Sequence, residues 1–192
     1  RPTDKQKIIQ ILIKLSAIDG EVAPEEIKLI KEFADKWRID IPILQPGKPE
    51  EVTNLVDLKD LVQSYLDEKP DVEVAKGLRD MITLMSEADH KVTLEEAMAV
   101  AEFSGMIGNY VNAEKDRKVD MFEVNIVPQG EKQLRAIKEL LPKLNSVNDR
   151  GGEVFKIGDF FSEEYSDAVC EKYINLGLYS NSVRIRAEPD KG

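Results

Sequence analysis

Two short acidic turns carry the side chains of this chain that could hold a metal ion. The first turn contains Asp19 and, seven residues later, Glu26, and the second contains Asp89 and Glu96 at the same spacing. Carboxylate oxygens are the hard ligands that Ca²⁺ and Mg²⁺ prefer. The spacing therefore predicts a divalent cation as cofactor, Ca²⁺ or Mg²⁺, with these four carboxylates as its ligands.

The same acids also have a purely structural explanation. Glu26 and Glu96 fall in the first turn of an expected helix, where a carboxylate is favoured by the helix dipole. Thr93 and Glu96 match a capping box, and Gly20 supplies the positive φ that a tight turn needs. The sequence leaves the cation site and the helix caps as two open alternatives.

Neither turn is a complete EF-hand. Asp19 and Glu26 match the fifth and twelfth positions of that loop, but its first and third positions would be Leu15 and Ala17, which have no side-chain oxygen. A bound cation would therefore need ligands from both turns or from water. His90, the only histidine, replaces the glycine of the first turn, and we interpret it as a solvated turn residue.

The two turns belong to an internal repeat. Shifting the chain by 70 positions aligns residues 12–33 with residues 82–103, and seven of these 22 positions are identical, among them Ser16 with Ser86 and Phe33 with Phe103. Each copy predicts a helix, an acidic turn and a second helix. Duplicated helix pairs that pack together would place the two turns in related positions.

The elements around the turns predict an α+β chain. Apolar residues recur at helical spacing from Lys5 to about Asp116, and the pattern then changes to short alternating segments. We expect an all-helical bundle with the helix-pair repeat in residues 1–114 and a small βαβαβ sheet module backed by two helices in residues 115–192. The expected helices span residues 5–18, 24–37, 52–66, 72–88, 94–110, 131–144 and 163–177, and the expected strands span residues 121–127, 153–158 and 182–187.

The segment from Ser16 to Glu26, followed by Ile30, Phe33 and Trp37, resembles the tellurite-resistance TerB-like family, and the second copy from Ser86 to Glu96 is similar. This resemblance covers about residues 3–112. It implies a compact, non-enzymatic helical domain of bacterial stress-response or envelope-associated assemblies. It also implies an acidic surface that holds a divalent metal or docks a protein partner.

Residues 155–160, with Gly177 and the segment from Val183 to Ile185, resemble the second half of a SPOR domain. This resemblance covers about residues 120–188, and the expected opening strand contains Asn125 where glutamine is usual. It implies a small sheet backed by two helices that binds peptidoglycan glycan strands lacking stem peptides. The two resemblances imply different bacterial compartments, the cytoplasm for the first and the envelope for the second.

A glycan would need polar groups on the open face of that sheet. Asn125, Lys156 and Arg184 are the candidate glycan-binding residues, although alternating basic residues on a strand are also typical of an ordinary solvated face. The residues that we expect to face the helices instead are Phe155, Ile157, Val183 and Ile185.

Composition excludes several functions. The formal net charge of −10 disfavours nucleic acid as a partner, because nucleic acids attract clustered Lys and Arg. No apolar run approaches the length needed to cross a bilayer, so we expect no membrane insertion of this segment. With one histidine, one cysteine and no phosphate-binding glycine motif, we expect no enzyme activity. Because the chain begins at Arg1, we expect a fragment or a processed form.

Overall fold

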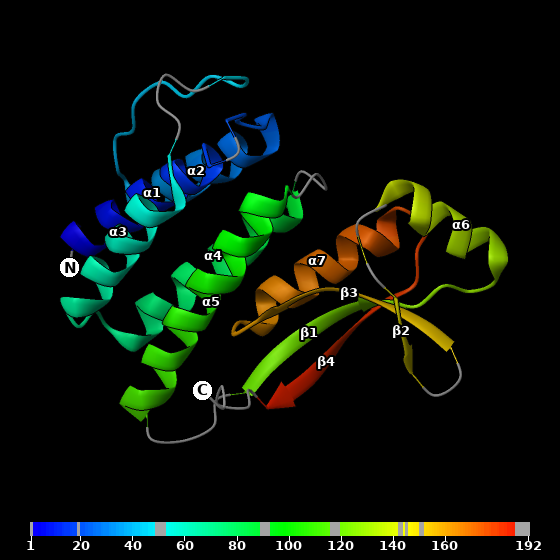
Figure 1. Ribbon diagram of the computed structural model, residues 1–192. Helices are drawn as coiled ribbons and strands as arrows, with labels where there is room; N and C mark the ends of the chain where they lie inside the picture. The colour runs from blue at the N-terminus through cyan, green and yellow to red at the C-terminus, as the bar shows by residue number, and fades with distance from the viewer. Residues whose placement is uncertain are drawn as a thin grey trace. The chain divides into compact units, whose positions relative to one another are not determined.

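The chain forms two compact units, Arg1–Glu114 and Lys115–Gly192. The computed structural model describes residues 2–18, 20–48, 53–88, 93–115, 120–141, 144, 146–149 and 152–186 (Figure 1). In these residues it contains seven helices and one antiparallel four-stranded sheet, so the fold class is α+β. The division between the units falls where the sequence changes from helical to alternating apolar spacing.

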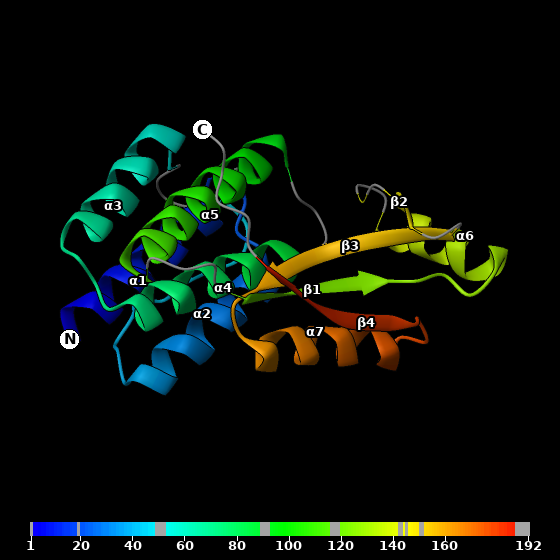
Figure 2. The same cartoon turned by 90° about the horizontal axis from the view of Figure 1, so that it is seen from below.

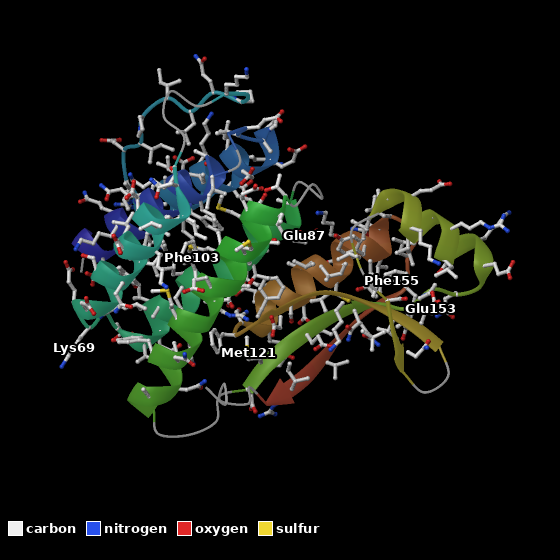
Figure 3. The ribbon with its side chains drawn as sticks, in the orientation of Figure 1. Lys69, Glu87, Phe103, Met121, Glu153 and Phe155 are labelled. Atoms are coloured by element: carbon white, nitrogen blue, oxygen red, sulfur yellow. The ribbon has the colours of Figure 1, made fainter. Side chains whose placement is uncertain are left out.

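Five helices make up the first unit. They are α1 (Pro2–Ser16), α2 (Pro24–Trp37), α3 (Leu55–Asp67), α4 (Val72–Ala88) and α5 (Leu94–Lys115). α1 is central, because it contacts α2, α3 and α4. Its apolar stripe is buried as the spacing predicts, with Ile8, Ile11 and Leu12 fully inaccessible to solvent. α5 is longer than expected and adds Phe103 to the core (Figure 3).

The loop after α2 is held against the first acidic turn. Arg38 ends α2 in the left-handed conformation, with φ of 55°. Farther along, Val22 and Gly47 exchange two backbone hydrogen bonds of 2.7 and 2.9 Å. Leu44 packs on a small apolar cluster formed by Ala17, Val22 and Ile27. The proline-rich loop is thus anchored beside the turn that precedes α2.

The second unit has one strand more than the sequence predicts. Its elements are β1 (Asp120–Ile126), α6 (Glu131–Leu140), β2 (Ser146–Asp149), β3 (Gly152–Phe160), α7 (Glu163–Asn175) and β4 (Ser180–Arg186). The strand order in the sheet is β2-β3-β1-β4. The expected βαβαβ order is therefore wrong, because β2 was missed. This strand is short and polar, lies at the sheet edge, and has one apolar residue, the exposed Val147.

Only one face of the sheet is covered by α7. This helix contacts β1, β3 and β4 and runs along the sheet in Figure 2. Ser166 of α7 shares a hydrogen bond of 2.9 Å with Ser182 of β4, which identifies the covered face. Of the two helices expected to back the sheet, α7 covers it, whereas α6 lies near the end where β3 begins (Figures 1 and 2). Phe155 is buried in the core of this unit (Figure 3).

No helix in the part of the chain that the structure describes combines the length and apolar character needed to span a membrane.

Candidate functional site

The acidic repeat places two glutamates at the same position of two helices. Glu26 is the third residue of α2 and Glu96 is the third residue of α5. Their exposed fractions are 2% and 3%. Glutamate is almost never this deeply buried unless its carboxylate is paired. Asp19, Asp89 and His90 lie outside the described residues, so their positions relative to the two glutamates are still sequence predictions.

Glu26 acts as a helix cap. Its Oε1 accepts a hydrogen bond of 3.3 Å from the backbone N–H of Ala23, the residue before Pro24 at the start of α2. Proline at this first position suits the helix because the missing N–H would have no intrahelical partner. One oxygen of the Glu26 carboxylate is therefore engaged in the structural role that the sequence left open.

At the start of α5, the residue before the helix accepts the capping hydrogen bond. Thr93 Oγ1 accepts a hydrogen bond of 3.2 Å from the backbone N–H of Glu96. This is the first half of the capping box that the sequence predicts at the start of α5. The two copies of the repeat thus place a buried glutamate at the same position of the helix, and both helix starts have a side-chain cap.

The backbone at the first turn has the expected conformation. Gly20 has φ of 78°, in the left-handed region that glycine adopts without strain. The two hydrogen bonds between Val22 and Gly47 fix the chain directly after it. The first turn is therefore held on one side by the loop and on the other by the start of α2, where Glu26 lies.

Among the described residues, no three His, Cys, Asp or Glu side chains lie close enough together to form a metal site. That group of residues does not include Asp19 and Asp89. A site of the predicted composition would therefore have to be completed by these two aspartates.

The three candidate glycan-binding residues do not share one face of the sheet. Asn125 pairs with Lys156 on β3 and with Asn181 on β4. Arg184 is two residues from Ser182 and therefore lies on the face that α7 covers. There it forms an ion pair with Asp120, which raises the pKa of the guanidinium through a hydrogen bond and charge attraction. The placement of Arg184 on the open face was wrong.

The apolar residues of β4 also lie on the face of the sheet opposite to the one that the sequence predicts. Val183 and Ile185 alternate with Ser182 and Arg184, so they lie on the face opposite α7 rather than against the helix. Phe155 does face α7, as expected, and it is 1% exposed. Ile157 is the extra residue that β3 carries at a bulge, between the partners of Val124 and Asn125.

Two amide side chains on the face opposite α7 have unused hydrogen-bonding capacity. The Oδ1 atoms of Asn125 and Asn181 are buried and have no hydrogen-bond partner in the described part of the chain. Beside them, Lys156 Nζ lies 3.5 Å from Glu123 Oε2. Asn181 carries no signal in the sequence, because only the register of β1 against β4 reveals that it lies opposite Asn125.

Comparisons with known proteins leave the family open. No family model matches the chain, and no solved structure matches it. A curated relative, a chaperonin GroEL of Methanospirillum hungatei, is 26% identical over 157 residues, which are 81% of this chain. The chain spans 26% of the length of that chaperonin.

Proposed function

We propose that this protein is a non-enzymatic binding protein of two modules, whose helical unit holds a divalent cation at the repeated acidic turns. The proposal is supported by the burial of Glu26 and Glu96 at equivalent positions of the repeat. Each follows an aspartate, Asp19 or Asp89, by seven residues. Carboxylate pairs of this kind suit Ca²⁺ or Mg²⁺. The resemblance to TerB-like domains favours a role in a bacterial stress response.

The cation proposal is tested by calorimetric titration of the full chain with CaCl₂, MgCl₂, MnCl₂ and ZnCl₂. The informative variants are Asp19→Asn and Asp89→Asn, because Glu26 also caps a helix and its replacement would confuse binding with folding. Glu32→Gln, which changes an exposed acid of α2, is the matched control. We expect saturable heat with Ca²⁺ or Mg²⁺ that both aspartate variants weaken and the control retains. Absence of heat with all four salts would contradict the proposal.

The helical unit also offers a role that needs no metal. If the carboxylates serve only as caps and buried acceptors, the same unit is a docking scaffold for a stress or envelope partner. The calorimetric result separates the two roles, because a scaffold gives no cation-dependent heat.

A second candidate function, binding of peptidoglycan glycan strands, is suggested by the polar side chains on the face of the sheet opposite α7. Asn125 and Asn181 have buried amide oxygens without a hydrogen-bond partner among the described residues, and Lys156 is exposed beside them. Sugars are recognised by hydrogen bonds of this type on a pre-formed surface. The resemblance to SPOR domains adds that the glycan would lack stem peptides.

The glycan proposal is tested by co-sedimentation with amidase-treated sacculi. Lys156→Ala and Asn181→Ala should each reduce the bound fraction. Arg184→Ala is a sharp control, because Arg184 lies on the opposite face and its exposed ion pair contributes little stability. Equal losses in all three variants, or no binding by the wild type, would contradict a glycan site on this face.

The proposed lack of enzyme activity follows from the available nucleophiles and bases. Cys170 is buried in α7 and therefore shielded from substrates. The Glu26 carboxylate is engaged at the start of α2, and those of Asp120 and Glu123 form ion pairs with Arg184 and Lys156. We accordingly propose binding rather than catalysis for both units.

A further inference from the structure

Three large apolar side chains are exposed at the beginnings of α3 and α5. The exposed fractions are 67% for Val56, 73% for Leu94 and 53% for Met98. Isolated apolar residues on a protein surface need no explanation, but a continuous group marks an interaction site. These three side chains therefore mark an interaction site only if they lie close together.

An ion pair joins α3 and α5 close to these three residues. Lys59 Nζ of α3 lies 2.8 Å from Glu102 Oε1 of α5. Val56 precedes Lys59 by one helical turn, and Met98 precedes Glu102 by one turn. α3 and α5 run side by side in the same direction in Figures 1 and 2. Val56 and Met98 therefore each lie one turn before this ion pair on adjacent helices, and Leu94 lies one turn before Met98. We call these three residues the α3–α5 strip.

The outer face of α5 contains few charges. From residue 97 to residue 113, Glu102 is the only charged residue. Ala97 and Ala101, next to Met98, are exposed. A surface helix usually places charged residues on its solvent side. The small side chains leave room for another helix to approach closely, which ordinary exposure to water does not require.

The border of the strip is acidic. Asp57, Asp60 and Glu95 are exposed, and α5 carries no base between residues 94 and 113. The one base of α3, Lys59, is already held by Glu102, whose hydrogen bond and negative charge raise the lysine pKa. The negative charges around the strip are therefore not compensated by a nearby unpaired base on these two helices.

We propose that the α3–α5 strip docks an amphipathic helix of a partner protein, with an apolar face that covers Val56, Leu94 and Met98 and with lysine or arginine along its edges. An apolar row of side chains spaced by helical turns matches the anchors of a helix laid along a surface. The acidic border selects a basic partner and speeds its association. This inference identifies the surface and the partner for the docking role and is independent of the cation site.

The test uses a defined probe, a fluorescently labelled peptide of about 18 residues, or five helical turns, with leucine on one helical face and lysine on the other. A second peptide replaces every lysine by glutamate, and a third has the composition of the first in scrambled order. We expect saturable binding of the first peptide in fluorescence anisotropy and at least about tenfold weaker binding of the other two.

Variants identify the surface. The double change Leu94→Ser and Met98→Ser removes apolar contact without adding charge, and it should weaken binding by about tenfold or more. The double change Asp60→Asn and Glu95→Gln should weaken binding and reduce its dependence on salt. Ile43→Ser is the matched control, because Ile43 is 91% exposed in another part of the same unit.

Three results would overturn the proposal. The first is unchanged affinity in the Leu94→Ser and Met98→Ser variant when its circular dichroism shows a folded protein. The second is equal binding of the lysine and glutamate peptides. The third is a wild-type dimer in light scattering that the serine variant dissociates, because the occupant of the strip would then be a second copy of this chain. Failure of cation binding would leave the proposal intact.

Discussion

Val22 and Gly47 exchange both of their backbone hydrogen bonds, at 2.7 and 2.9 Å, although they are separated by α2. This two-residue bridge is isolated from the sheet of the second unit. It closes the loop after α2 onto the chain beside the first acidic turn. The turn is thereby coupled to a loop that the sequence alone indicates only by its prolines.

Replacement of Gly47 should loosen this bridge. Gly47 has φ of 104°, a conformation that residues with a Cβ atom rarely adopt, although an added Cβ would contact nothing within 4 Å. The strain of Gly47→Ala is therefore in the backbone, and we expect a loss of about 1–2 kcal/mol in the free energy of unfolding. Urea denaturation measures it. An unchanged midpoint would show that the loop relaxes without cost.

Replacement of two other glycines should stabilise the protein. Gly77 of α4 and Gly108 of α5 are helical, and an added Cβ would meet no atom within 4 Å at either position. Alanine loses less conformational freedom than glycine when a helix forms. Gly77→Ala and Gly108→Ala should therefore each raise the free energy of unfolding by about 0.5–1 kcal/mol. Destabilisation by either change would mean that the glycine has a role in close packing.

Tyr65 should tolerate loss of its hydroxyl group. The side chain is 1% exposed, and its Oη has no hydrogen-bond partner in the described part of the chain. Removing an unsatisfied buried group avoids its desolvation penalty. Tyr65→Phe should thus be neutral or stabilising at pH 7. Tyr110→Phe is the control and should cost about 1 kcal/mol, because the Tyr110 hydroxyl donates a hydrogen bond of 2.5 Å to Pro70 O.

The burial of Tyr65 should also make the stability of the protein fall at alkaline pH. Burial, followed by the charge of Asp4, raises the pKa of Tyr65 far above its ordinary value. Above about pH 10 the unfolded chain ionises at this tyrosine while the folded chain does not, so stability falls as the pH rises. We expect a steeper loss between pH 9 and about 11 for the wild type than for Tyr65→Phe. Parallel curves from urea unfolding would contradict the raised pKa.

The sequence predicts the helical unit well because each helix carries its own signal. The apolar spacing of α1 and the proline at the start of α2 act locally, and the burial of Ile8 and Ile30 agrees with the local pattern. The capping box of Thr93 and Glu96 is equally local, since its partners are three residues apart. Whether the two acidic turns lie close together depends on tertiary packing. Their proximity is still a prediction.

The sheet was harder to predict because its pairing is not local. Ser146–Asp149 becomes a strand through hydrogen bonds to β3, with almost no apolar alternation of its own. For β4, the alternation of apolar and polar residues predicts the wrong buried face. The apolar Val183 and Ile185 suggested the buried side, but the small Ser180 and Ser182 lie on the covered side of the sheet. Small polar side chains allow α7 to approach there, and a hydrogen bond compensates for the burial.

That hydrogen bond gives the last prediction. Ser166 is fully buried, and its Oγ lies 2.9 Å from Ser182 Oγ across the boundary between α7 and β4. Ser166→Ala should lower the free energy of unfolding by about 1–2 kcal/mol, because the Ser182 hydroxyl loses this partner and the Glu163 carbonyl loses the hydrogen bond that Ser166 Oγ donates. Ser182→Ala should cost less, about 1 kcal/mol, because only the shared bond is lost. The double variant should cost less than the two single changes added together, by roughly 0.5–1 kcal/mol, since the shared bond is lost only once. Strict additivity in urea denaturation would show that the two serines act independently and that shape alone holds α7 on the sheet.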